Sequence, residues 1–333
     1  MFRFVCVFAF LLLVASPGTA RAEVHAWIFA GQSNMRGGQG QYASSMKTLV
    51  ESKGHTLLPI FSSAPGKPIS RWLNSDEKEY ADLWTRSLLG GITDAKRQGA
   101  IFKGMVWYQG ESDSDDPLAY AGKLNELISR VRKETGVADL PVIVIQLAAL
   151  VGYDAQPPKS WGFGLVREAQ RRVIAGLEGR GALVTAVDCE VGDYTVHLKQ
   201  PGHAIVAKRI VAAASHLAYD GPAHGWGPQF HRAYIADGDR KTVVVEFDHV
   251  QGEVKLGKGW RQAFGLSTRQ APLPRAMADA PPVNQWAALH ESWTPAAGAR
   301  AEGNRVVLLF DKPVAEGAAL SFCANTNAKF GMH

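Results

Sequence analysis

The chain has 333 residues, of which 46% are hydrophobic and 20% are charged, and its formal net charge at pH 7 is +5. A positive surplus this mild, with no block of Lys and Arg, gives no reason to expect a nucleic-acid partner. The length fits one large domain or one domain with a smaller appendage.

The N-terminal residues have the pattern of a secretory signal peptide. Arg3 precedes an apolar run from Phe4 to Val14, and Ala20-Arg21-Ala22 fits a cleavage site with small residues. The apolar run is too short to span a bilayer comfortably, which disfavours a retained anchor. We therefore expect residues 1–22 to be removed, and the mature protein to be secreted or periplasmic and not attached to a membrane.

Between Glu23 and about Tyr219, apolar runs alternate with segments of helical periodicity. This alternation predicts a parallel sheet that is covered by helices on both faces. The predicted strands are Ala26–Ala30, His55–Phe61, Ile101–Tyr108, Pro141–Leu147 and Ala182–Val187, and the predicted helices are Glu79–Lys96, Leu118–Glu134, Phe163–Leu177 and His203–Leu217.

The pattern changes after Asp220. Strand-like runs at Lys241–Phe247, Arg305–Phe310 and Ala319–Phe322 lie among glycines and prolines, without a clear helix. We expect a small β-rich domain, with a sandwich as its form. The predicted organisation is therefore a signal peptide (1–22), an α/β domain (23–220) and a β-rich appended domain (221–333).

Two cysteines remain once Cys6 leaves with the signal peptide. Cys189 and Cys323 are far apart in the sequence. In an oxidising compartment they can form a disulfide, and they can equally remain two buried thiols. The sequence leaves this choice open, as it does the oligomeric state.

Three polar motifs follow predicted strands or precede predicted helices. They are Gly31-Gln32-Ser33-Asn34-Met35-Arg36-Gly37, Trp107-Tyr108-Gln109-Gly110-Glu111-Ser112-Asp113 and Asp193-Tyr194-Thr195-Val196-His197-Leu198. Open α/β sheets place their chemistry at the carboxyl ends of the strands. The motifs supply a serine, an amide donor, a histidine and an acid, which are the groups that nucleophilic acyl transfer requires.

Each of these residues has an expected role. Ser33 supplies the nucleophilic oxygen and, through its own N–H, an oxyanion donor, and Gln109 supplies a side-chain donor. His197 is the expected base, with Asp193 as the first candidate for the acid that orients it and Asp188 as the second.

For Glu111 the favoured role is ion pairing or bracing of the loop, and the alternatives are a general acid or a metal ligand. No His/Asp cluster has the spacing of metal ligands, so we expect no metal and no cofactor.

These motifs resemble those of the SGNH/GDSL hydrolases, in particular the sialate O-acetylesterase-like carbohydrate esterases. The resemblance also includes the segment Leu198-x-x-x-Gly202-His203-x-x-x-Ala207-x-Arg209, and it extends from about Ala26 to Leu217. It implies a flavodoxin-like three-layer α/β/α fold. It also implies an acetylated carbohydrate as the substrate.

The resemblance assigns roles residue by residue. Ser33 matches the nucleophile, His197 the base and Gln109 the side-chain oxyanion donor. Gly66 lies in a segment, Pro65–Trp72, that resembles the one whose glycine N–H is the remaining donor. Gln32 and Asn34 are expected to contact substrate or brace the site. The family places its acid three residues before the histidine, where this chain has Tyr194, with Asp193 one residue earlier.

The function that these observations favour is a secreted serine esterase that removes O-acetyl groups from a sialic acid or an acetylated polysaccharide. The alternative is a glycan-binding protein that retains the fold and has lost turnover because its acid is displaced. A lipase is disfavoured because the chain has no Gly-x-Ser-x-Gly elbow. The loops Gln39–Tyr42 and Tyr153–Gly162 are expected to set specificity.

Overall fold

The computed structural model of the chain describes residues 22–73, 82–150, 159–192, 196–236, 238–256, 264–267, 293–316 and 318–322. Residues 1–21 of the predicted signal peptide, Asp193 and Cys323 lie outside these ranges. Within them, no helix has both the length and the apolar character that crossing a membrane requires.

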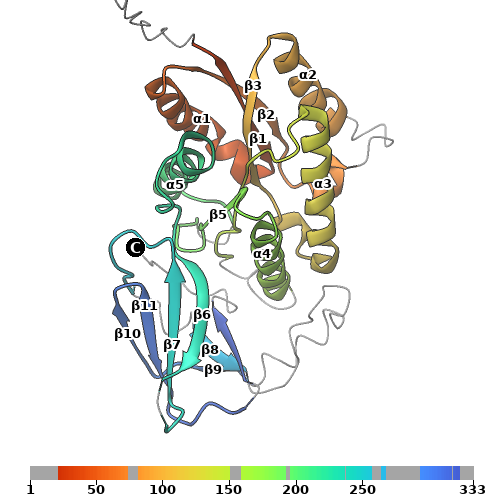
Figure 1. Cartoon of the computed structure of the whole chain (residues 1–333). Coiled ribbons are helices and arrows are strands. Elements are labelled where there is room, and N and C mark those ends of the chain that lie inside the picture. The colour runs from red at the N-terminus through yellow and green to blue at the C-terminus, as the bar shows by residue number, and fades with distance from the viewer. Residues whose placement is uncertain are drawn as a thin grey trace, which may run out of the picture.

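A five-stranded parallel sheet forms the centre of the larger part of the molecule (Figure 1). Its spatial order is β2-β1-β3-β4-β5, which is the flavodoxin-like order. The strands are β1 (Val24–Gly31), β2 (Thr56–Ser63), β3 (Ile101–Tyr108), β4 (Val142–Ile145) and β5 (Gly181–Val184). Because the sheet grows in one direction from β1 to β2 and in the other through β3, the topological switch point lies between β1 and β3.

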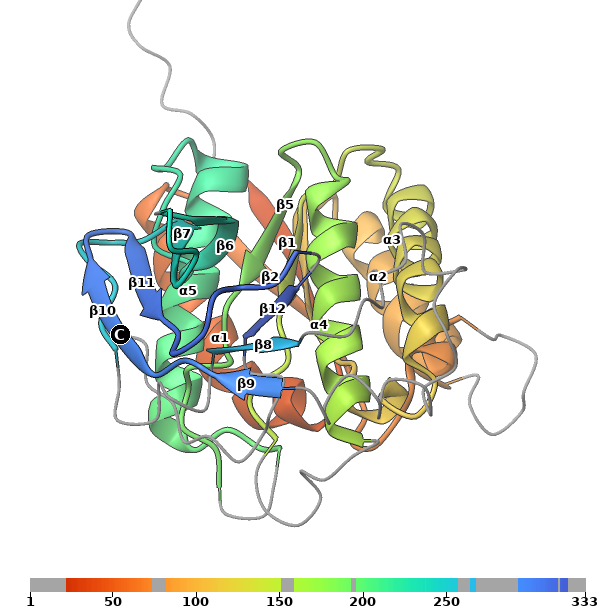
Figure 2. The same ribbon diagram turned by 90° about the horizontal axis from the view of Figure 1, so that it is seen from below.

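Helices cover both faces of this sheet, which confirms the predicted α/β class. Helices α1 (Ser33–Ser52) and α5 (Gln200–Tyr219) pack together on one face, and α2 (Gly90–Arg97), α3 (Tyr120–Thr135) and α4 (Lys159–Ala175) lie on the other (Figure 2). A π-helical segment at Asp82–Leu89 leads into α2, and short 3₁₀ turns occupy Ile69–Trp72, Glu111–Asp113 and Pro117–Ala119.

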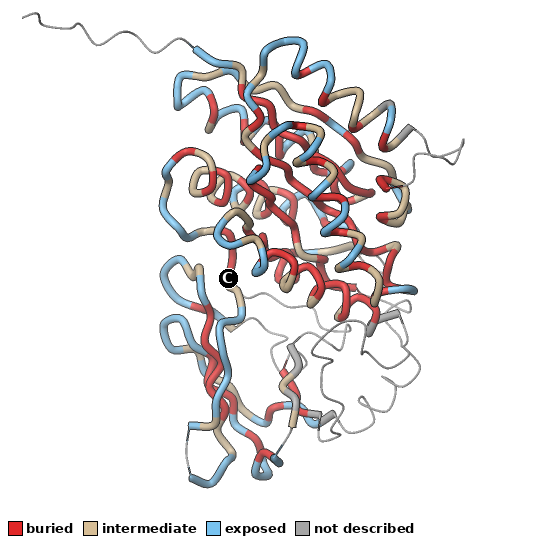
Figure 3. Tube along the Cα trace, turned by 45° about the vertical axis from the view of Figure 1, so that its right-hand side comes forward, coloured by how far each residue is buried: buried red, intermediate tan, exposed pale blue. Residues whose placement is uncertain are grey.

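The apolar core lies where these layers meet (Figure 3). Every residue from Ala26 to Ala30 is fully buried, because a central parallel strand has both faces covered. Trp72, from the turn after β2, packs edge-on against Trp107 of β3, with the ring centroids 5.2 Å apart. The core therefore extends to the carboxyl end of the sheet and supports the loops there.

The prediction of a loop at Gln39–Tyr42 was wrong, because these residues lie inside α1. Three glycines, at positions 37, 38 and 40, weaken the helical pattern in the sequence. Packing explains the glycine at position 38, since a Cβ there would lie 2.6 Å or less from atoms of Tyr42 and His203. The glycine allows α1 to approach α5 closely. Of the second expected loop, residues 153–158 lie outside the described part and 159–162 open α4.

Beyond Asp220, the described residues form antiparallel sheets and contain no helix. One sheet has the order β10-β11-β7-β6 and the other β12-β8-β9. The strands are β6 (Gln229–Ile235), β7 (Thr242–Asp248), β8 (Phe264–Ser267), β9 (Trp293–Pro295), β10 (Gly298–Glu302), β11 (Arg305–Leu309) and β12 (Ala319–Phe322). Side chains from both sheets share one apolar cluster, which is the packing of a sandwich. Val187, just after β5, packs into the same cluster and so connects it to the α/β part.

Candidate active site

Ser33 stands at a sharp turn between β1 and α1. Gly31 has φ +148°, and a Cβ at this position would lie 2.0 Å from the carbonyl oxygen of Tyr108 on β3. The next amide, that of Gln32, donates to the same oxygen at 3.0 Å. Only glycine lets the two strand ends approach this closely, and the turn makes Ser33 the first residue of α1.

The N-terminus of α1 gives this serine an electropositive setting. The first intrahelical bond runs from the Arg36 amide to the Gln32 carbonyl, at 2.9 Å, so the amides before Arg36 have no acceptor within the helix. Together with the helix dipole, such amides stabilise negative charge. The Gln32 side chain does not cap them. Its Oε1 accepts bonds from the amides of Gly110 and Ser112 instead, at 3.4 and 3.3 Å.

His197 faces Ser33 from the loop between β5 and α5. Its Nε2 lies 2.9 Å from the Ser33 Oγ, which is hydrogen-bonding distance. Val191 and Leu198 pair as an antiparallel bridge across the base of this loop, and the Gly192 amide donates to the His197 carbonyl at 3.0 Å. The structure thus joins the predicted nucleophile to the predicted base, although 164 residues separate them in the sequence.

The buried side chain of Asn34 holds the backbone on both sides of His197. Its Nδ2 donates to the carbonyl of Val196 at 3.0 Å, and its Oδ1 accepts from the amide of Leu198 at 3.0 Å. The second hydrogen on Nδ2 goes to Oε1 of Glu111, at 2.6 Å. Asn34 follows Ser33 directly in the chain, so the same helical turn that presents the nucleophile also positions the base.

Glu111 is almost fully buried, with 6% of its surface exposed. Burial raises the pKa of its carboxyl to about 7, and the hydrogen bond from Asn34 opposes that rise. Among the described residues, its Oε2 has no hydrogen-bond partner. The carboxyl therefore braces Asn34 through one oxygen and is close to its titration point at neutral pH.

The side-chain amide of Gln109 is also buried and fixed in orientation. Its Nε2 donates to Oδ2 of Asp113 at 2.5 Å and to the carbonyl of Lys67 at 3.1 Å. Both hydrogens of this amide thus face acceptors of the protein. To act as an oxyanion donor, Gln109 must exchange one of these contacts, and the neutral Lys67 carbonyl is the weaker acceptor of the two.

Asp113 links the Gln109 segment to the turn that carries Gly66. The same Oδ2 accepts the backbone N–H of Ile69 at 2.9 Å, and burial raises the pKa of this carboxyl. Gly66 itself occupies an exposed turn with φ +63°, a conformation that favours glycine. Asp113 ends the motif that begins at Trp107, and its place there is consistent with a residue that braces the loop.

Asp188, the second candidate for the acid, forms a buried ion pair. Both of its oxygens lie 2.7 Å from guanidinium nitrogens of Arg209, which also donates to the carbonyl of Thr185. The bidentate pair occupies both oxygens of this carboxylate. Asp193, the first candidate, lies outside the described residues. The adjacent Cys189 is a free, buried thiol, and burial raises its pKa to about 12.

Behind His197, two buried side chains join α1 to α5. The Tyr42 hydroxyl lies 2.7 Å from Nδ1 of His203. Burial lowers the pKa of the His203 imidazole, and the neighbouring His197 lowers it further. His203 belongs to the Leu198–Arg209 segment, and the only local sign of its partner Tyr42 is Gly38, one turn earlier in α1.

A serine bonded to a histidine at the carboxyl edge of an open α/β sheet defines the arrangement of serine hydrolases. Residues 40–216, more than half of the chain, match the family model described as carbohydrate esterase, sialic acid-specific acetylesterase. The chain belongs to this family of carboxylic ester hydrolases, which confirms the resemblance seen in its motifs. The matched range includes Gln109 and His197 and begins after Ser33.

The individual proteins that resemble this chain share less than a quarter of its residues in the aligned regions. A probable carbohydrate esterase of Arabidopsis thaliana is 24% identical over 115 residues, which are 34% of this chain and 42% of that protein. The chain thus matches less than half the length of this relative. The crystal structure of a carbohydrate acetylesterase from Xanthomonas citri has a TM-score of 0.66 at 19% identity, over 92% of this chain and 77% of the other. This likeness shows the fold.

Proposed function

We propose that this protein removes O-acetyl groups from a carbohydrate through an acetyl-enzyme on Ser33. The observation that carries the proposal is the 2.9 Å contact between the Ser33 Oγ and the His197 Nε2, at the N-terminus of α1. A serine hydroxyl is a weak nucleophile until a base within hydrogen-bonding distance takes its proton. The contact supplies that base.

In the proposed reaction, the Ser33 Oγ attacks the acetyl carbonyl carbon while its proton passes to the His197 Nε2. The negative charge that develops on the carbonyl oxygen is stabilised by the N–H of Ser33, with Gly66 and Gln109 as the further proposed donors. The imidazolium then gives its proton to the departing sugar oxygen, and the acetyl group stays on Ser33. Water, activated by His197, releases acetate and restores the serine. Asp193 is the proposed acid that orients the imidazole.

The substrate and the compartment are parts of the same proposal. We propose an acetylated sialic acid or an acetylated polysaccharide as the substrate, in keeping with the description of the matching family model. Residues 1–22 have the pattern of a signal peptide, and a secreted or periplasmic enzyme would meet such glycans. No nucleic acid, membrane or cofactor enters this proposal.

The test measures acetate release from p-nitrophenyl acetate, O-acetylated sialic acid and acetylated xylan. Ser33→Ala should lower kcat by about three orders of magnitude or more. The matched control is Ser44→Ala, an exposed serine on the same helix. If Ser33→Ala keeps near-normal turnover with an intact fold, the acetyl-enzyme is wrong. If the wild type binds acetylated glycans and releases no acetate, the protein is a glycan-binding protein instead.

A further inference from the structure

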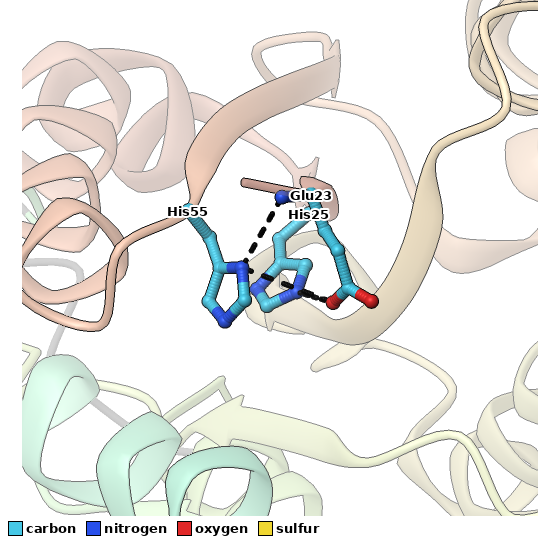
Figure 4. Close-up of side chains that lie close together, drawn as sticks. All are labelled: Glu23, His25 and His55. Carbon is cyan, nitrogen blue, oxygen red and sulfur yellow. Dashed lines mark hydrogen bonds and ion pairs between the residues drawn. The ribbon is translucent and has the colours of Figure 1, made fainter. Parts of the chain in front are cut away.

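Three side chains with metal-ligating atoms meet at the end of the sheet opposite to Ser33. Glu23 directly precedes β1, His25 is the second residue of β1, and His55 directly precedes β2 (Figure 4). One ligand atom from each residue lies within 4.8 Å of the others. The parallel pairing of Val24 with Thr56 brings the two segments together across 32 residues of sequence.

The distances among these atoms are close to those of a tetrahedral zinc site. Oε2 of Glu23 lies 3.0 Å from Nε2 of His25 and 3.8 Å from Nδ1 of His55. Zinc bonds of 2.0–2.1 Å at tetrahedral angles separate neighbouring donors by about 3.3 Å. These two separations lie within about 0.5 Å of this value, and all three lie below 4.8 Å. Nδ1 of His55 also accepts the backbone N–H of Glu23 at 3.3 Å, a bond that an ion would replace as the ring turns.

His25 also has the outer partner that a metal-bound imidazole needs. Its Nδ1 lies 3.1 Å from the hydroxyl of Tyr219, whose oxygen also accepts the indole N–H of Trp27 at 3.2 Å. When Nε2 binds a metal, the ring proton moves to Nδ1 and can be donated to this oxygen.

The charged groups near the cluster have opposite effects on the binding of a cation. The carboxylate of Glu23 contributes a negative charge and is about half exposed, which leaves an approach from solvent. Lys103, on β3, brings a positive charge that acts on both Glu23 and His25 and opposes a cation. The His25 and His55 rings are tilted by 31° relative to one another, with centroids 3.9 Å apart.

We infer that Glu23, His25 and His55 bind a divalent transition-metal ion, with Zn²⁺ as the class of ion that two imidazoles and one carboxylate favour. The expectation of no metal ligand set, drawn from sequence spacing, missed this cluster because strand pairing creates it. His25 lies eight residues before Ser33, and β1 rises about 3.3 Å per residue, so the ion would be about 26 Å from the nucleophile. Its role is to clip the beginning of β1 to the beginning of β2.

The test uses purified, untagged protein and Zn²⁺ alone. We expect one Zn²⁺ per chain by elemental analysis after equilibrium dialysis, a higher melting temperature with Zn²⁺ than with EDTA, and unchanged esterase turnover in both conditions. His55→Gln and Glu23→Gln should each raise the dissociation constant more than about tenfold, since even outer partners of a metal are worth 10–100-fold. Tyr219→Phe, which removes such an outer partner, should raise it about tenfold.

The matched control is His231→Gln. His231 is an exposed histidine on β6 that pairs with Asp248 at 2.8 Å and lies outside the cluster. This variant should bind Zn²⁺ as the wild type does, and Lys103→Gln should bind it more tightly. A concentration of 50 μM Zn²⁺ is on the order of the dissociation constant of a weak protein site. The inference is overturned if this concentration gives neither stoichiometric binding nor a shift in melting temperature. It is equally overturned if binding persists unchanged in both His55→Gln and Glu23→Gln.

Discussion

The side-chain nitrogen of Asn34 lies 2.6 Å from a carboxylate oxygen of Glu111. The second hydrogen of this nitrogen and the side-chain oxygen of Asn34 bond to the backbone on either side of His197. Glu111 comes from the turn after β3, Asn34 from the beginning of α1 and His197 from the loop after β5. One buried amide therefore connects three loops of the proposed site. The orientation of the base depends on it.

Replacing Asn34 with alanine should impair turnover more than substrate binding. The variant loses the two bonds to the segment of His197, and a displacement of about 1 Å at a catalytic group can cost about 100-fold in rate. We expect kcat for p-nitrophenyl acetate to fall about 100-fold with little change in KM. Thr48→Ala, at an exposed position of the same helix, is the control. A kcat within about threefold of the wild type would show that other contacts suffice to hold His197.

Substitution of the two candidate acids should change two different quantities, the free energy of unfolding for Asp188 and kcat for Asp193. Asp188→Asn breaks a buried bidentate pair with Arg209, which typically costs about 3–5 kcal/mol of unfolding free energy. Its kcat per folded molecule should stay near the wild-type value. Asp193→Asn should lower kcat by up to about 10⁴-fold and leave stability nearly unchanged.

Kinetics and denaturant unfolding on both variants check this assignment. A large kcat loss in folded Asp188→Asn would make Asp188 the acid. If neither variant loses more than about tenfold, the site works as a Ser-His dyad.

Glu111 should make stability depend on pH in a defined direction. Its folded-state pKa of about 7 exceeds the ordinary value of 4.5, so the folded state holds the proton more tightly than the unfolded chain. The contribution of Glu111 is fully present below pH 4.5 and is lost as the pH rises through 7, by about 3 kcal/mol. Glu111→Gln cannot titrate. The stability of this variant relative to the wild type should therefore improve by about that amount between pH 4 and pH 8, measured by denaturant unfolding. A constant difference across this range would contradict a raised pKa of the buried Glu111 carboxyl.

Two glycines of α1 should respond oppositely to the same substitution. Gly40→Ala meets no atom within 4 Å and should stabilise the protein by about 0.5–1 kcal/mol, as alanine does inside an exposed helix. Gly38→Ala places a methyl group against Tyr42 and His203 and should destabilise by about 1–3 kcal/mol. Thermal unfolding of the two variants gives the comparison. If both are stabilising, the approach of α1 to α5 is looser than the packing indicates.

The parallel sheet could be predicted because its buried strands are continuous apolar runs bounded by polar turns. Helix α1 could not, because three glycines weaken its pattern and one of them, Gly38, serves a contact with α5 that only the folded chain contains. Strands β8, β9 and β10 contain a glycine or a proline and no continuous apolar run, so they could not be predicted. Strand β6 is exposed almost throughout.

Some residues of the site could likewise be predicted from the sequence, and others could not. Ser33, Gln109 and His197 could be located because each follows a strand, and parallel strands end at one edge of a sheet. The bonds of Asn34 and Asp113 depend on where individual backbone amides point, which the order of residues does not reveal. The cluster of Glu23, His25 and His55 depends on the register of β1 against β2.

The antiparallel bridge between Val191 and Leu198 closes the base of the loop that contains His197. With the Gly192 amide bonded to the His197 carbonyl and the Leu198 amide bonded to Asn34, both sides of the loop are anchored. An insertion or deletion between Gly192 and Val196 should therefore leave His197 in place, because loop closure changes little with one residue. The four-residue spacing from Asp193 to His197, where the related motif has three, is a difference in length that such a loop can absorb.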